Sequence, residues 1–293
     1  MSKEQLDFIL EISAQNPPPQ GATHIQLREW FEGMNAQTPV AEGLEIEPVS
    51  IGPFAAEMLS THGADRSKLV IYYHGGGFLW GTARSYRVIA SNLARATGVP
   101  VLSVEYRLAP EHPAPTAHDD AFEAYRWALA EGYAPDNIAI TGDSAGGNLA
   151  LATAVRARDA GLPLPAAIAV FSPALDLASE GQSHASEAPL LVRPLMDLFN
   201  AIYIGDGDRK SPQVTPFHSD LAGLPPTLIH VGSWELLRDD SVTMAERLKA
   251  AGVAAELKVW DGMVHSWQLF APMLDEGMAS IEEAGAFLRD RLA

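Results

Sequence analysis

The stretch from Gly142 to Gly146, Gly-Asp-Ser-Ala-Gly, carries a hydroxyl between two glycines. A short β-branched run precedes it and a segment of helix-forming composition follows it. Strand, tight turn and helix in that order are the context in which Gly-x-Ser-x-Gly exposes its serine. A helix N-terminus favours negative charge, so Ser144 is a candidate nucleophile. Taken alone, the pentapeptide also fits a glycine-rich helix cap that does no chemistry.

A run of glycines supplies the second chemical feature. A near-continuous apolar segment of the kind buried in parallel sheets ends in His74-Gly75-Gly76-Gly77. Glycines let backbone N–H groups approach a ligand closely, and acyl transfer needs such donors for a developing oxyanion. We expect Gly76, Gly77 and Ala145 to supply them, with Gly75 as the weakest member of the set. No Gly-Lys-Ser/Thr ending supports a phosphate loop, and we expect His74 to orient the glycines.

An imidazole and several carboxylates follow two later strand signals. Glu235 comes after one predicted strand and His265 after the next. Nucleophile, carboxylate and histidine, each just past a strand, is the chain order of an α/β-hydrolase triad. Asp239 and Asp240 are rivals for the acid, and Asp261 is a weaker one.

The elements that must position these groups are predicted from periodicity. Strand and helix signals alternate from residue 68 onward, which predicts an α/β fold with a mostly parallel sheet and helices on both faces. An antiparallel hairpin around Gly52-Pro53 precedes them. The polar, proline-rich segment 105–113 is interpreted as an ion-paired loop that braces the nucleophile turn, so Glu105, Arg107 and Glu111 are expected to be structural.

Helical spacing also appears outside the sheet. Residues 2–15 and 23–35 form two amphipathic segments, the second with Thr23 as its N-cap, and helical spacing returns at 190–204 within a stretch that has no strand signal. We expect a helical cap from residues 1–42 and 180–212 on a catalytic domain of 43–179 and 213–293. The candidates for substrate contacts are Trp30, Phe31, Met34, Phe78, Leu79, Trp80, Asp143 and the segment 190–204. At helical spacing such apolar residues are also typical of plain core.

Composition bounds the function. The chain has 293 residues, 47% hydrophobic and 19% charged, and a net charge of −17. That charge argues against nucleic acid and anionic membranes as partners. The lack of cysteine excludes disulfides, thiolate catalysis and cysteine-bound zinc. No apolar run is long enough to span a membrane and the N-terminus lacks a signal-peptide pattern, so we expect a cytoplasmic protein.

Taken together, the motifs resemble the hormone-sensitive lipase family of esterases, whose bacterial members form family IV of the lipolytic enzymes. The resemblance is carried by His74-Gly75-Gly76-Gly77, by segments 105–113 and 142–148, and by the loops of Glu235 and His265. It implies an α/β-hydrolase core with a cap, and hydrolysis of short-to-medium acyl esters through an acyl-enzyme without a cofactor. It also suggests a homodimer, with the predicted strand 255–260 at a sheet edge.

Two positions depart from the common family pattern. Glu235-Leu236 stands where Asp-Pro is frequent, and the register of that motif favours Glu235 as the acid. His-Ser-Trp stands at 265–267 where His-Gly-Phe is frequent. Trp267 is expected either to narrow the site or to pack in the core.

Other functions fit parts of the pattern. A ligand-binding protein of the same fold that has lost catalysis is disfavoured because His265 is present. An amidase or a deacetylase of sugars would use the same nucleophile and stays open. Metal-dependent hydrolysis is disfavoured, since the nine histidines show no ligand spacing such as His-Glu-x-x-His.

Overall fold

The computed structural model describes residues 2–35 and 38–293. In this part of the chain, eight strands form one sheet in the order β1-β2-β4-β3-β5-β6-β7-β8. The strands from β4 to β8 in that order run parallel, and the β1–β2 hairpin adds antiparallel to β4. Their bounds are β1 (Leu44–Ile51), β2 (Phe54–Thr61), β3 (Leu69–Tyr73), β4 (Val101–Glu105), β5 (Ile138–Asp143), β6 (Ala167–Phe171), β7 (Thr227–Gly232) and β8 (Ala255–Trp260).

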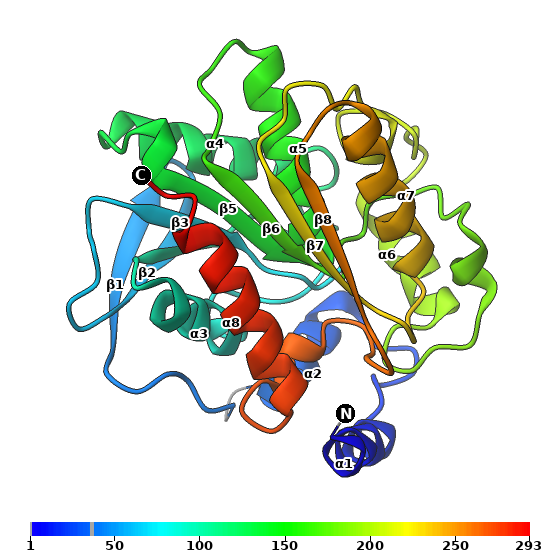
Figure 1. Cartoon of the computed structure of the whole chain (residues 1–293). Helices are drawn as coiled ribbons and strands as arrows, with labels where there is room; N and C mark the ends of the chain where they lie inside the picture. Colours follow the sequence, from blue (N-terminus) through cyan, green and yellow to red (C-terminus); the bar gives the residue numbers. More distant parts are fainter. Residues whose placement is uncertain (1, 36–37) are drawn as a thin grey trace.

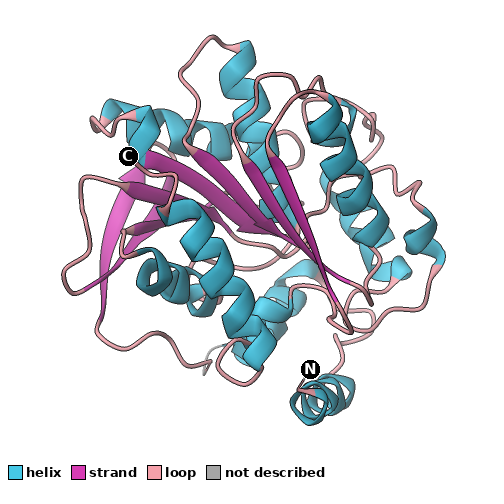
Figure 2. Cartoon of the chain, viewed as in Figure 1, coloured by secondary structure: helices cyan, strands magenta, loops and turns pink. Residues whose placement is uncertain are grey.

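Helices cover both faces of the sheet (Figures 1 and 2). α3 (Arg87–Thr97) and α8 (Asp275–Arg289) pack together on one face, and α4 (Thr116–Ala130), α5 (Ala145–Asp159) and α7 (Arg238–Ala250) pack on the other. Because successive side chains point to opposite faces, Val70 and Tyr72 of β3 enter one core while Ile71 and Tyr73 enter the other. The predicted α/β class, the antiparallel hairpin and the edge position of β8 are confirmed.

Helices from both ends of the predicted cap pack near the carboxyl ends of the strands (Figure 1). They are α1 (Lys3–Gln15), α2 (His24–Asn35) and α6 (Arg193–Ile204). Leu6 of α1 shares an apolar cluster with Leu190, and Phe31 of α2 shares another with Phe199 of α6. The contact of the N-terminal segment with the insertion therefore supports the division into cap and catalytic domain, which stays a prediction. Residues 1, 36 and 37 of the predicted cap lie outside the described residues.

Thr23 lies immediately before α2, in the N-cap position that the sequence predicts. The Gln26 N–H donates to Thr23 Oγ1 at 3.3 Å, and the Thr23 N–H donates to Gln26 Oε1 at 3.0 Å. This reciprocal pair is a capping box, which satisfies N–H groups that the first helical turn leaves unpaired.

The proline-rich loop contacts a different neighbour from the one predicted. The Tyr106 hydroxyl donates to His74 O at 2.7 Å, and the Ala109 N–H donates to Phe78 O at 2.9 Å. Arg107 pairs with Asp120, as expected of a structural ion pair. The loop thus braces the glycine run after β3, not the nucleophile turn, because β4 lies beside β3 and on its far side from β5.

A buried polar network ties α6 to the body of the protein. The Asn148 amide donates to Ala174 O at 2.8 Å and Val214 O at 3.1 Å, so its oxygen accepts from His118 Nε2 at 2.9 Å. His118 Nδ1 then accepts from the Tyr203 hydroxyl at 2.7 Å. Burial lowers the pKa of His118 to about 4, so the imidazole is neutral and holds this one pattern of hydrogen bonds.

Candidate active site

Ser144 lies at a sharp turn between β5 and α5. Its backbone has φ 50° and ψ −118°, an uncommon conformation for a residue with a side chain. A Cβ on Gly146 would overlap the Tyr73 carbonyl oxygen, and one on Gly142 would overlap Gly146 O. Glycine at both positions therefore lets helix and strand approach closely enough for the turn to form. Ser144 is 8% exposed, so its hydroxyl is shielded but reachable.

Three side chains far apart in sequence form a hydrogen-bonded chain at this turn. His265 Nε2 lies 3.0 Å from Ser144 Oγ, and His265 Nδ1 lies 3.1 Å from Glu235 Oε2. The Gly232 N–H donates to the other carboxylate oxygen of Glu235 at 3.0 Å. An ionised carboxylate only accepts, so Nδ1 carries the proton and Nε2 offers its lone pair to the serine hydroxyl. This is the arrangement that a serine nucleophile and its base require.

The other candidate carboxylates contact groups other than His265. Asp239 accepts the Ser183 N–H at 2.8 Å, and Asp240 contacts His184 Nε2 at 2.9 Å. Asp261 accepts from the Ser233 hydroxyl at 3.4 Å. Glu235 is the member of the predicted set in contact with His265.

The glycine run presents its N–H groups unequally. The Gly75 N–H donates to Asp143 Oδ1 at 2.9 Å, so it is not available to an oxyanion, and the prediction of Gly75 as a donor is wrong. Gly76 and Gly77 have left-handed backbones with φ of 102° and 60°. Gly77 and Ala145 line the same cavity as Ser144. Ala145 is the first residue of α5, where N–H groups have no partner within the helix.

His74 is a buried, neutral residue of the loop. Its ring stacks between Tyr106, with centroids 4.2 Å apart, and Tyr86, with centroids 5.3 Å apart. Burial lowers its pKa to about 4, and its Nδ1 donates to Gly75 O at 2.8 Å. These contacts agree with the predicted orienting role.

Asp143 is a structural anchor and not a substrate contact. It is fully buried, and it accepts from the Tyr72 hydroxyl at 2.7 Å, the Gly75 N–H at 2.9 Å and the Ser266 hydroxyl at 3.1 Å. Burial raises its pKa to about 6. Its predicted role in substrate binding is wrong, because the side chain is fully buried, accepts from protein groups at both oxygens and does not line the cavity.

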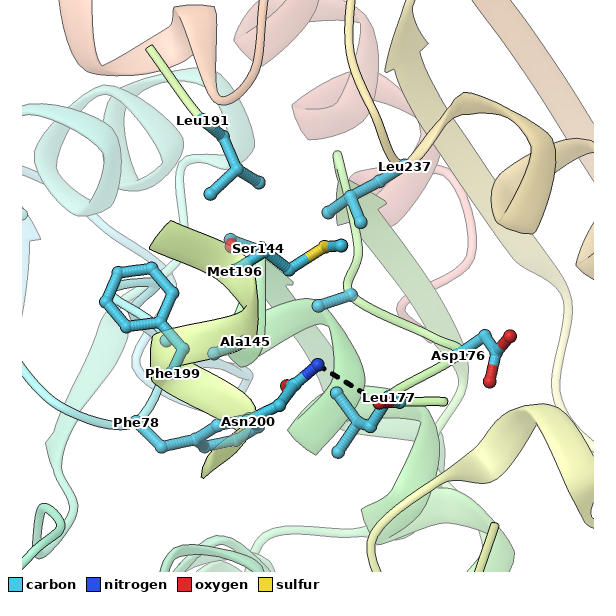
Figure 3. Close-up of a pocket in the computed structure, with 12 residues that line it drawn as sticks. Phe78, Ser144, Ala145, Asp176, Leu177, Leu191, Met196, Phe199, Asn200 and Leu237 are labelled. Carbon is cyan, nitrogen blue, oxygen red and sulfur yellow. Dashed lines mark hydrogen bonds between the residues drawn. The ribbon is translucent and has the colours of Figure 1, made fainter. Parts of the chain in front are cut away.

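A small apolar cavity lies beside Ser144 (Figure 3). Its volume is about 30 Å³. Phe78 and the α6 residues Met196, Phe199 and Asn200 contribute to its wall, together with Gly77, Ser144, Ala145, Ala174, Asp176, Leu177, Leu191 and Leu237. Phe78 and the segment 190–204 therefore contribute to this cavity, and their role in substrate binding stays a prediction. Asp176, Leu177 and Leu237 were not predicted and stand in no motif.

The aromatic residues predicted from α2 lie behind this wall. Phe31 stacks on Trp80 with centroids 5.6 Å apart, and Trp80 meets the edge of Phe199 at 4.7 Å. Met34 is 40% exposed. Trp30, Phe31, Met34, Leu79 and Trp80 are not among the residues that line this cavity, and Phe199 of α6, which does line it, packs against Trp80. Their role in the acyl pocket stays a prediction.

Neither a metal centre nor a membrane segment is found in residues 2–35 and 38–293. No group of three or more histidine, aspartate or glutamate side chains there is arranged to hold a metal ion. None of the described helices is long and apolar enough to cross a bilayer.

Comparison with known proteins identifies the family of the chain. The family described as alpha/beta hydrolase fold matches residues 70–269. An acetyl-hydrolase of Streptomyces hygroscopicus is 41% identical over 82% of this chain and 81% of its own length. The esterase LipU of Mycobacterium tuberculosis is 39% identical over 80% and 82%.

Solved structures agree over the whole chain. An esterase from the bacterial hormone-sensitive lipase family superposes with a TM-score of 0.95 at 39% identity, covering 99% of each chain. A hormone-sensitive lipase from a metagenome library gives a TM-score of 0.95 at 36% identity, covering 100% of this chain and 99% of that one. The chain therefore belongs to the α/β-hydrolase fold and, within it, to the hormone-sensitive lipase family of esterases.

Proposed function

We propose that the protein hydrolyses carboxylic esters of short acyl chains through an acyl-enzyme, with Ser144 as nucleophile, His265 as base and Glu235 as the acid. The observation that carries this proposal is the continuous chain of hydrogen bonds, 3.0 Å and 3.1 Å long, from Ser144 through His265 to Glu235. Membership of an esterase family supports it.

The steps follow from the geometry. Ser144 Oγ bonds to the ester carbonyl carbon while its proton passes to His265 Nε2, and Glu235 stabilises the imidazolium. The carbon–oxygen bond to the alcohol then breaks and the alcohol takes the proton from Nε2. Water, deprotonated by the same imidazole, attacks the acyl-enzyme and releases the acid and Ser144.

The oxyanion of each tetrahedral intermediate is assigned to the N–H groups of Gly76, Gly77 and Ala145. Gly75 is omitted because its N–H already donates a hydrogen bond to Asp143. Each such donor contributes about 10²–10³ to kcat in a preorganised, water-excluded site.

The size of the cavity favours substrates with a short acyl group. About 30 Å³ is enclosed between Phe78, Met196 and Phe199, and its lining is largely apolar. An acetyl-hydrolase among the relatives supports the same size class. We therefore expect acetate and butanoate esters to be preferred over longer ones, because longer chains require these side chains to move.

The test of the proposed function is turnover of p-nitrophenyl acetate by Ser144→Ala. Removing the nucleophile is expected to lower kcat by about 10⁶ and to abolish covalent labelling by a fluorophosphonate. Ser67→Ala, an exposed serine before the opposite end of β3, serves as the matched control. Retained turnover and labelling in Ser144→Ala would refute the proposal. Rates on the matched p-nitroanilide separate esterase from amidase.

A homodimer along β8 is proposed as well. β8 ends the sheet with an unpaired edge, and Val259 is 41% exposed on it. Light scattering after gel filtration would give the mass of the particle, and Val259→Lys is expected to shift it toward the monomer. The cytoplasmic location stays a prediction from the sequence.

A further inference from the structure

Ser266, the residue after the triad histidine, lies between the Asp143 carboxylate and the His265 imidazole. Its Oγ is 3.1 Å from Asp143 Oδ2 and 3.5 Å from His265 Nε2. The side chain is 4% exposed. Its backbone is left-handed, with φ 47° and ψ 42°, and its N–H donates to Ser172 Oγ at 3.2 Å. A conformation that favours glycine is thus kept here by a residue with a hydroxyl.

The direction of the Ser266 hydrogen bond follows from its partner. An ionised carboxylate only accepts, so the Ser266 hydroxyl donates to Asp143 and turns its lone pairs toward the imidazole. The other oxygen of Asp143 is occupied by the Tyr72 hydroxyl and the Gly75 N–H. The hydroxyl therefore connects a buried negative charge to the nitrogen that takes the proton of the nucleophile.

That nitrogen needs an acceptor during the reaction. Once Ser144 Oγ has passed its proton to His265 and bonded to the acyl carbon, it has less electron density to offer the new Nε2–H. The next permanent acceptor near Nε2 is Ser266 Oγ at 3.5 Å, already polarised by its bond to Asp143.

We propose that Ser266 is a positioning residue that stabilises the His265 imidazolium, accepting from Nε2–H while it donates to Asp143. The inference rests on the triad assigned above. It also explains why Asp143 is buried beside the nucleophile without touching the cavity. The charge of Asp143 acts on the imidazole through the Ser266 hydroxyl.

Several charged or titratable groups surround the link from His265 through Ser266 to Asp143. Glu235, after β7, faces Nδ1, and Asp143, at the end of β5, faces Ser266. Tyr72 on β3 and Tyr86 before α3 lie next to Asp143, and burial raises the pKa of both phenols well above the usual range, so they stay neutral. Burial raises the pKa of Asp143 to about 6, so the link is complete above that pH.

The test is the pH profile of Ser266→Gly against the unaltered protein, with p-nitrophenyl acetate between about pH 5 and about pH 9. Glycine keeps the N–H and the left-handed turn and removes the whole hydroxymethyl side chain, whereas alanine removes the hydroxyl alone. The plateau of kcat/KM is expected to fall roughly 3- to 10-fold, and the acid limb to move to lower pH by roughly half to one unit, since one unit corresponds to a tenfold change. Ser266→Ala should behave alike.

A purely structural role of Ser266 would give a different pH profile. A lower plateau with an unmoved acid limb, or no change in either, would overturn the proposal. The Asp143→Asn background tests the link itself, because Ser266→Gly should then change the plateau less than about twofold if the charge acts through the hydroxyl. Equal effects of Ser266→Gly in both backgrounds would reject the link.

The same series separates this inference from the function on which it rests. Ser144→Ala without turnover, beside an active Ser266→Gly whose acid limb has not moved, rejects only the role of Ser266. Full turnover in Ser144→Ala rejects the proposed triad.

Discussion

Replacing Phe199 by alanine is expected to shift the preference of the enzyme toward longer acyl chains. The ring of Phe199 lies directly over the glycine run, since a Cβ on Gly77 would overlap it, and its centroid lies 4.7 Å from that of the Trp80 ring in a T-shaped contact. It is 7% exposed and lines the cavity of about 30 Å³ beside Ser144. Removing the ring joins its volume to that cavity.

The magnitude follows from the methylenes that then fit. Each buried methylene contributes about 0.8 kcal/mol, or about fourfold in kcat/KM at 25 °C. Two methylenes give roughly 16-fold, so the ratio of hexanoate to butanoate turnover should rise by about tenfold or more. The substitution costs about 3–5 kcal/mol where a buried phenylalanine cannot be compensated by collapse, so the assay belongs well below the melting temperature.

The assay is kcat/KM for p-nitrophenyl acetate, butanoate, hexanoate and octanoate. Leu198→Ala is the matched control, because it lies on the same helix, is 40% exposed and does not line the cavity. Circular dichroism checks that both variants fold. A folded Phe199→Ala with the chain-length profile of the unaltered protein would refute the assignment of the acyl pocket.

Three further outcomes are expected. Glu235→Gln should lower kcat by about 10⁴ and Asp239→Asn only slightly, and the reverse ranking in steady-state rates would move the acid to Asp239. Gly77→Ala should lower kcat by about 10²–10³ through its clash with Phe199, with partial recovery in the double variant that carries Phe199→Ala; no recovery would deny the clash. Burial raises the pKa of Glu105 from 4.5 to about 7, so the folded state holds this proton more tightly and stability falls as pH rises through that window. Glu105→Gln should therefore raise Tm at about pH 8 and leave it nearly unchanged at about pH 4.5, and equal shifts at both values would contradict the burial argument.

Local motifs made the nucleophile and the sheet predictable. Glycines around Ser144 specify a backbone that few residues adopt, and apolar runs that end in polar loops mark the carboxyl ends of buried strands. The acid of the triad was harder to predict, because Glu235, Asp239 and Asp240 stand within one short segment. What separates them is tertiary structure, such as the pairing of Asp240 with His184, 56 residues away in sequence.

The pocket was the least predictable part. Phe31 and Trp80 carry the same residue types and spacing whether they face a ligand or a neighbouring helix, and α6 decides between the two. Leu177 and Leu237 reach the cavity only through the fold. The loss of Gly75 as an oxyanion donor likewise depends on Asp143, 68 residues away, and no local pattern signals it.

The two ends of α6 are held in different ways. Its carboxyl end is anchored to His118, and Asn200 donates to Leu177 O at 3.0 Å. Its amino end carries Met196 and follows Leu191; both pack in an apolar cluster and line the cavity, and Met196 Sδ also accepts from the Ser179 hydroxyl at 4.0 Å. Hydrogen bonds thus hold the carboxyl half of α6, whereas its amino end is held mainly by apolar packing. We therefore expect an acyl group too large for the cavity to displace the Leu191 end of α6 first, whereas Phe199 limits the size of group that fits without such a displacement.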